Sequence, residues 1–168
     1  MARIEIPTGA GPELGRVWAL CPEMAPGVGG LAAAVYEHSK LPAREREVAR
    51  MRVAQLNDCH ICLGWRQPEL AAAGVTEELY EHVGEAGYTG FSEREQLAME
   101  YAERFAIDHR NLDDAFFARM RAHFSDAEIL DLSICLANWV GFGRVNQVLA
   151  IDEGCAVPAP AGGVSSLV

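Results

Sequence analysis

Apolar and polar residues nowhere alternate one by one over a sustained stretch of this chain, and neither Asn-Gly nor Asp-Gly, the commonest hairpin turns, occurs in it. Signals for strands are therefore nearly absent, whereas signals for helix starts are frequent. The pattern predicts an all-α fold. Helices are expected near residues 28–39, 43–56, 59–73, 76–86, 92–107, 112–123 and 125–151.

Local capping and turn residues mark several of the expected helix ends. Residues 92–95 and 125–128 each begin with Ser and end with Glu, the capping box in which both side chains bind backbone N–H groups at a helix start. Pro68 lies inside the third expected helix and should kink it or split it in two, because proline has no N–H and its ring clashes with the preceding turn. Gly74 stands where that helix should end.

The longest apolar stretch, Ile129 to Ile151, contains Asp131, Asn138, Arg144 and Asn146. These polar side chains would be costly in a lipid bilayer. We therefore expect a buried core helix here, not a membrane span.

A chain of 168 residues has the length of one domain with one core. Residues 1–27 are rich in Gly and Pro and are expected to run over the surface, and residues 28–151 to form the helical domain. Residues 152–168, made mostly of small residues and Pro, should form a loose tail.

The charge balance is acidic, with 14 Lys and Arg against 24 Asp and Glu and a formal net charge of -10. Nucleic acids and anionic membranes require clustered positive charge, so neither is expected as a partner. The N-terminus shows no basic start followed by an apolar run, the mark of a secretory signal. Five cysteines form an odd, sparse set that does not suit a disulfide framework. Together these features indicate a reducing, cytoplasmic setting.

The closest pair of cysteines carries the candidate chemistry. On a helix that begins after Asp58, Cys59 and Cys62 share one face with Arg66 between them. Asp58 is expected to be the N-cap, which places Cys59 in the first turn near free backbone N–H groups. Such surroundings favour the thiolate, which is the reactive form of cysteine. The spacing also allows the two sulfur atoms to form a disulfide.

Two other interpretations of the cysteine pair stay open. A zinc site needs four ligands and usually a second close pair, and the remaining cysteines are isolated. Both thiols could also be buried structural residues. For Glu47, which lies on the preceding helix, an acid/base role competes with a salt bridge to Arg44 or Arg50 one turn away.

Two further features are interpreted as structural. Gly141-Phe142-Gly143 lacks the third glycine and the preceding strand of a dinucleotide-binding fingerprint, so it should allow close helix packing. Trp65 and Trp139 are expected to be packing residues of helical core faces.

Glu47, eleven intervening residues and then Cys59-x-x-Cys62, on consecutive helices of a small helical chain, resembles the alkyl hydroperoxidase D and carboxymuconolactone decarboxylase superfamily. The resemblance is most specific from residue 41 to 107 and extends through Ile151. It implies a helical bundle that assembles into trimers or hexamers. In its redox branch, Cys62 would attack the peroxide and become a sulfenic acid. Cys59 would be the proton-donating and resolving partner, and Glu47 the far end of a proton relay.

Arg66 stands where the redox branch of the superfamily has its relay His. A guanidinium group is always charged and cannot shuttle protons, but it can stabilise a nearby thiolate. We therefore include Arg66 among the candidate catalytic residues as an electrostatic partner of Cys62.

The sequence thus predicts a cofactor-free, metal-free thiol-dependent peroxidase or disulfide oxidoreductase of antioxidant type. It would act on a small peroxide and be reduced again by an external dithiol or protein. One alternative is a lyase acting on a lactone acid, with Arg66 binding a substrate carboxylate and Glu47 moving protons. Another is a non-catalytic redox sensor or oligomeric scaffold. Self-association is also expected because helix 43–56 has apolar residues on several sides.

Overall fold

The computed structural model of the protein describes residues 2–151, and within them it contains helices and no strands. The tail expected at 152–168 lies outside the described residues. The elements are α1 (Glu13–Val17), η1 (Trp18–Leu20), α2 (Ala25–Glu37), α3 (Ala43–Leu56), α4 (His60–Gly64), η2 (Pro68–Ala73), α5 (Glu77–His82), α6 (Glu93–Ile107), η3 (His109–Asn111), α7 (Asp114–His123) and α8 (Asp126–Leu149). The predicted all-α class is confirmed.

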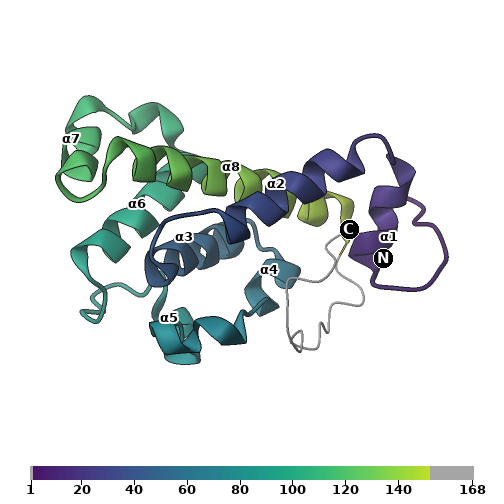
Figure 1. Ribbon diagram of the computed structural model, residues 1–168, viewed down its shortest axis with the longest axis horizontal. Helices are drawn as coiled ribbons and strands as arrows, with labels where there is room; N and C mark the ends of the chain where they lie inside the picture. The colour runs from purple at the N-terminus through teal and green to yellow at the C-terminus, as the bar shows by residue number, and fades with distance from the viewer. Residues whose placement is uncertain (1, 152–168) are drawn as a thin grey trace.

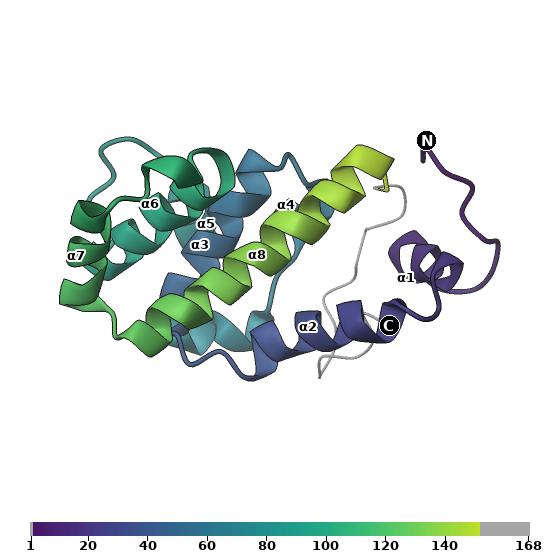
Figure 2. The ribbon, with the colours of Figure 1, turned by 90° about the horizontal axis from the view of Figure 1, so that it is seen from above.

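Helix α3 forms the centre of the bundle. It packs chiefly on α6 and α8, and α4, α5 and η2 lie against it as well. Figures 1 and 2 show α8 crossing the length of the molecule, with α7 at one end and α1 at the other. Nine of the fourteen residues of α3 are buried. The apolar faces of α3 that suggested self-association are therefore covered by helices of the same protomer.

The predicted capping boxes are confirmed at the two longest helices. Ser92 and Glu95 begin α6, and Ser125 and Glu128 begin α8, with each Ser side chain accepting from the N3 backbone N–H and each Glu side chain accepting from the N-cap N–H. These contacts satisfy N–H groups that the helix itself leaves free. The starts of both helices are therefore fixed by local sequence.

The predicted break at Pro68 is also confirmed. The helix expected over 59–73 is divided into α4 and the 3₁₀ helix η2, which begins at Pro68. Gln67, which precedes the proline, has an extended backbone, as residues before proline prefer. Gly74 ends η2 in the left-handed conformation that glycine adopts without strain.

The N-terminal segment lies along the C-terminal half of α8. The backbone N–H of Arg3 donates to the Leu149 carbonyl. The ring of Trp18 meets that of Phe142 edge to face, with 5.9 Å between their centroids. Residues 1–27, which we expected at the surface, thus contribute α1, η1 and the start of α2 beside the end of α8.

Close packing at Gly143 positions the chain segment that precedes the cysteine pair. Asn57 is buried, and its Nδ2 donates to the carbonyl oxygen of Trp139 on α8. A Cβ atom at Gly143 would lie 2.5 Å from that Nδ2, so any other residue there would displace the Asn57 amide from this contact. The packing role expected for the glycine pair is confirmed for Gly143, whereas Gly141 faces open space. Among residues 2–151, no helix combines the length and apolar character needed to cross a membrane.

Candidate active site

The cysteine pair lies at the start of α4, just after the tight turn that joins it to α3. Asp58 has a φ of 50°, a left-handed conformation that Asp tolerates better than most residues. Cys59, not Asp58, is the N-cap of α4, and its sulfur accepts from the backbone N–H of Cys62. The predicted capping role of Asp58 is therefore wrong, because its backbone turns the chain before the helix begins. Helix α4 has only five residues, so its dipole is small. The local stabilisation of the Cys59 sulfur comes from this hydrogen bond.

Cys59 and Cys62 are joined by a disulfide in this structure, with 5.3 Å between their Cα atoms. The two residues differ in exposure, since Cys59 is 2% exposed whereas Cys62 is half-buried and lines a cavity. A molecule in that cavity can reach Cys62 first. The other two cysteines of the described part are the exposed Cys21 and the buried Cys135.

Glu47 is fully buried in the middle of α3, where three side chains surround its carboxylate. Arg50 Nε donates to Oε2 over 2.7 Å, and the Tyr80 hydroxyl donates to the same oxygen over 2.9 Å. Arg46 approaches Oε1 to 3.9 Å, but Oε1 has no hydrogen-bond partner among residues 2–151. The salt bridge that we weighed against an acid/base role is therefore present, and it is made with Arg50.

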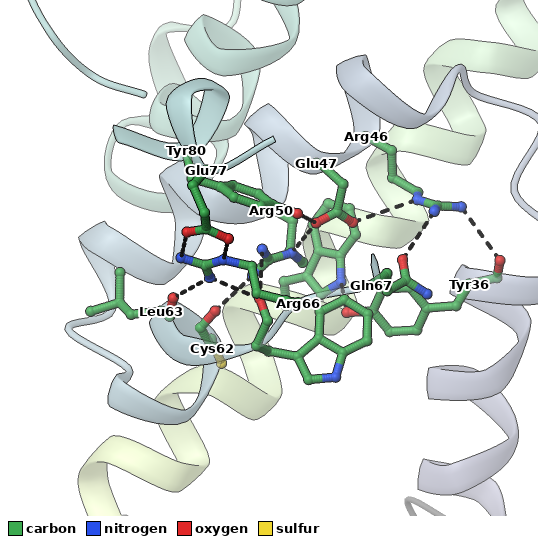
Figure 3. Close-up of polar contacts among 12 residues, drawn as sticks. Tyr36, Arg46, Glu47, Arg50, Cys62, Leu63, Arg66, Gln67, Glu77 and Tyr80 are labelled. Atoms are coloured by element: carbon green, nitrogen blue, oxygen red, sulfur yellow. Dashed lines mark hydrogen bonds and ion pairs between the residues drawn. The ribbon is translucent and has the colours of Figure 1, made fainter. Parts of the chain in front are cut away.

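Arg50 connects Glu47 to the cysteine turn. Its Nη1 donates to the Cys62 carbonyl over 2.7 Å, and its Nη2 contacts the Trp65 carbonyl at 3.4 Å (Figure 3). Burial lowers the pKa of Arg50, but the neighbouring Glu47 carboxylate more than offsets this, so the pKa lies above its usual value. A buried, charged Arg50 thus fixes the end of α4 relative to α3.

Two tyrosines complete the buried polar cluster. Burial, reinforced by the Glu47 carboxylate, raises the pKa of Tyr80 to about 12, so its phenol stays protonated and donates to Glu47. Burial likewise raises the pKa of Tyr36 to about 12, and its hydroxyl accepts from Trp139 Nε1 over 3.1 Å. Both residues were missed in the sequence because they lie on other helices, far from the motif.

Arg66 does not share a helical face with the cysteines, because α4 ends at Gly64. Its guanidinium group forms a two-pronged salt bridge with Glu77, at 2.7 and 3.0 Å, and donates to the Leu63 carbonyl. In Figure 3 the Cys62 carbonyl faces the two guanidinium groups while its sulfur points away. The predicted placement of Arg66 between the two cysteines is therefore wrong.

The cavity beside Cys62 has a volume of about 130 Å³ and lies between α2, α3, α4, α8 and the N-terminal segment. Its walls are mostly apolar and aromatic, and Trp65 and Trp139, which we expected to be packing residues only, belong to them. Arg50 contributes the one charged side chain of the lining. The structure thus joins a disulfide-bonded cysteine, a buried cation and an apolar chamber in one place.

Metal ligands do not gather around this site. Within residues 2–151, no three His, Cys, Asp or Glu side chains lie close enough together to hold a metal ion. The residues that the structure brings together are Glu47, Cys59 and Cys62, linked through Arg50, while Arg66 lies at the edge.

Comparison with solved structures supports the fold. A protein of unknown function from Agrobacterium tumefaciens, described as an antioxidant defence protein AhpD, superposes with a TM-score of 0.71. It is 21% identical, and the match covers 80% of this chain and 93% of that one. An uncharacterised peroxidase-related protein from Silicibacter sp. TM1040 gives a TM-score of 0.69 at 19% identity, over 84% of this chain and 75% of that one.

Sequence comparison points the same way. The uncharacterised protein YnjA of Escherichia coli (strain K12) is 27% identical over 125 residues, which are 73% of this chain and 69% of the relative. The uncharacterised protein YdfG of Bacillus subtilis (strain 168) is 23% identical over 112 residues, 66% of this chain and 76% of the relative. Residues 22–104, which contain Glu47 and both site cysteines, match the carboxymuconolactone decarboxylase family. Over residues 22–104 the chain is thus similar to the carboxymuconolactone decarboxylase family, which agrees with the superfamily resemblance that the cysteine motif indicated.

Proposed function

We propose that the protein is a thiol-dependent peroxidase in which Cys62 attacks the peroxide and Cys59 resolves the product. The observation that carries this proposal is the unequal exposure of two bonded cysteines. Cys62 lines the cavity, while Cys59 is buried directly behind it. The accessible sulfur suits the attacking role, and the shielded sulfur suits the resolving role.

The reaction balances with an external dithiol. The Cys62 thiolate attacks the terminal oxygen of an organic hydroperoxide, the O–O bond breaks, and the departing alkoxide takes a proton to become an alcohol. The Cys59 thiol then displaces water from the Cys62 sulfenic acid, which gives the disulfide present in this structure. A dithiol or a protein reductant returns both cysteines to thiols and is itself oxidised to a disulfide.

The residues around the cysteines have positioning and acid/base roles in this proposal. Glu47 is its acid/base group, and the Tyr80 hydroxyl, which donates to the Glu47 carboxylate, holds that carboxylate in place. Arg50 holds the backbone of Cys62 and places a positive charge at the cavity. Arg66 acts at a distance, by fastening the end of α4 through the Leu63 carbonyl.

The test is consumption of tert-butyl hydroperoxide with excess dithiothreitol as reductant. We expect Cys62→Ser to fall to the rate of protein-free buffer. Cys59→Ser should turn over more slowly than wild type, because dithiothreitol must then reduce the sulfenic acid directly, and dimedone should label its Cys62. Cys21→Ser, at an exposed cysteine outside the site, is the matched control and should keep the wild-type rate. Wild-type turnover in Cys62→Ser would contradict the proposal.

A second candidate is a lyase that removes carbon dioxide from a lactone acid. The observation that favours it is Arg50, the charged residue of the cavity lining, which would bind a carboxylate by giving up its contacts with the Cys62 and Trp65 carbonyls. Glu47, next to it, would supply the proton that replaces the lost carboxyl group. Release of carbon dioxide from carboxymuconolactone, unchanged in Cys59→Ser and Cys62→Ser, would support the lyase. A redox sensor would instead form the disulfide with peroxide yet show no sustained turnover with dithiothreitol.

A further inference from the structure

Two buried asparagines in the wall of the cavity each have a side-chain oxygen without a hydrogen-bond partner among residues 2–151. Asn138 and Asn146 both lie on α8, are 6% and 7% exposed, and line the chamber beside Cys62. The Oδ1 atom of each has no hydrogen-bond partner among residues 2–151. Burying an amide oxygen without a hydrogen bond is costly, and native structures seldom tolerate it. Because both residues line one chamber, a polar group of a ligand bound there is a candidate for the missing partner.

The rest of the lining defines what else that ligand must be. The walls include Tyr36, Phe142 and all three tryptophans of the chain, Trp18, Trp65 and Trp139. A cavity of about 150 Å³ lined by apolar side chains is known to bind benzene. The present volume of about 130 Å³ is similar. The body of the ligand should thus be apolar and about the size of one ring, far larger than hydrogen peroxide.

The charge of the lining argues for a neutral ligand. Arg50 is the one charged residue, and its Nε is already paired with the Glu47 carboxylate over 2.7 Å. Its Nη1 and Nη2 are directed to the backbone carbonyls of Cys62 and Trp65. Most of its hydrogen-bonding capacity is therefore used within the protein, so a carboxylate in this chamber would lose its hydration and gain little.

We infer that this cavity binds a neutral organic molecule with a ring-sized apolar body and a hydroxyl or similar polar group, which the amide of Asn138 or Asn146 holds by a hydrogen bond. The inference rests on the proposed function in one respect: the molecule bound in the cavity is taken to be the one that reacts with Cys62. The two amides stand eight residues apart on α8, which is about 12 Å along a helix. A ring-sized ligand reaches one of them at a time, so each is tested separately.

The experiment is a titration of the disulfide form, followed by tryptophan fluorescence, with three matched compounds. Benzyl alcohol is neutral and has a hydroxyl group, toluene lacks the hydroxyl, and benzoate carries a charge. We expect benzyl alcohol to bind most tightly. At least one of Asn138→Leu and Asn146→Leu should bind benzyl alcohol about threefold to tenfold more weakly, the range for one hydrogen bond, with little change for toluene. The disulfide form has no free thiol at Cys59 or Cys62, so this result is independent of peroxidase turnover.

Control variants separate loss of the site from loss of the fold. Asn111→Leu makes the same change at an exposed position of η3 and should bind as wild type. Ala32→Leu adds volume inside the cavity and should weaken both benzyl alcohol and toluene, whereas Ala33→Leu, next to it on α2 and outside the lining, should not. Leu in place of an unpaired buried amide should not lower the urea midpoint of unfolding.

Three results would overturn the inference. One is no fluorescence change with benzyl alcohol up to its solubility limit. Another is wild-type affinity for benzyl alcohol in both Asn138→Leu and Asn146→Leu. The third is tighter binding of benzoate than of benzyl alcohol, which would favour the lyase acting on an acid. Because peroxide consumption is measured on the reduced protein, a failure there leaves the binding result standing, and the reverse also holds.

Discussion

The charged partners of single residues decide which arginine contacts the segment that carries the cysteines. Arg66 is the arginine that the motif spacing suggests, yet it pairs with Glu77 and contacts the face of Tyr80 at 4.3 Å. The hydrogen bond from Arg66, together with its charge, holds the pKa of the Glu77 carboxyl below its usual range. Arg50, which the sequence offered only as a salt-bridge partner of Glu47, reaches the cavity and the Cys62 carbonyl instead.

The residue-scale prediction is that Arg66→Ala leaves the pH midpoint of Cys62 alkylation by iodoacetamide unchanged in the reduced protein. The reason is that the guanidinium group faces carbonyls and Glu77, and the sulfur points away from it. We expect a loss of about 1 kcal/mol in unfolding free energy, the size of a partly exposed salt bridge with a cation–π contact.

The matched control is Arg52→Ala, which removes a comparable arginine that pairs with Glu103 on the far side of α3. Peptide mass spectrometry after timed alkylation distinguishes Cys62 from the other cysteines. A midpoint moved upward in Arg66→Ala and unchanged in Arg52→Ala would show that Arg66 reaches the sulfur after all.

At the scale of elements, the long helices and α5 could be predicted, whereas α1, η1 and η3 could not. The bounds expected for α3 were 43–56, which are those observed, and the capping boxes of α6 and α8 are both formed. These starts depend on side chains within four residues, which is information that the sequence carries. The bonds among Glu47, Tyr80 and Arg50 depend on packing between α3 and α5, which local patterns do not report.

The misplacement of Arg66 has a local cause. The ring of a proline clashes with the carbonyl four residues earlier, and for Pro68 that residue is Gly64, where α4 ends. The proline also forces Gln67 out of the helical region. Arg66 was therefore never available to a helical face, and the same proline that predicted the break could have excluded it.

The element-scale prediction concerns acid stability at the start of α8. Hydrogen bonds from the Ser125 backbone and from Arg94 lower the pKa of Glu128 from 4.5 to about 2. A carboxylate whose pKa is lower in the folded state stabilises the fold above its unfolded pKa. That contribution is lost as pH falls from about 4.5 towards 2. Glu128→Gln should therefore lose less stability than wild type over this interval.

Urea unfolding at neutral pH and at pH values within this interval measures the difference. At neutral pH we expect Glu128→Gln to be less stable by about 1 kcal/mol or less, because the pair with Arg94 is partly exposed. Glu37→Gln, at an exposed carboxylate that ends α2, should lose stability in acid as wild type does. Equal acid sensitivity of Glu128→Gln and wild type would contradict the assigned hydrogen bonds.

At the scale of the whole molecule, α3 is an interior helix of the protomer and offers little surface to a second copy. The surface that can contact one lies on α8. The exposed large apolar side chains of α8 are Leu130, Ile134, Val145 and Val148. Together with the exposed Ala137 and Gly141 they follow one another at steps of four or three residues along the helix. That spacing forms a single stripe, which is typical of a helix that packs against another helix. The stripe stays uncovered by residues 2–151.

The last prediction is that this α8 stripe mediates assembly of the protein into trimers or hexamers. The small residues Ala137 and Gly141 at the middle of the stripe let two backbones approach closely, and the larger residues toward its ends supply apolar area. A carboxylate introduced there would be buried without a partner in the assembly.

Ile134→Glu and Val148→Glu should therefore sediment as protomers at micromolar concentration, where wild type should sediment as the oligomer. Met24→Glu changes an equally exposed apolar residue that precedes α2 and should keep the wild-type state. The helical content and the disulfide of all three variants should match wild type, so that a changed sedimentation coefficient reports assembly alone. A wild-type protein that sediments as a monomer, or a Val148→Glu variant that assembles normally, would exclude the stripe as the contact.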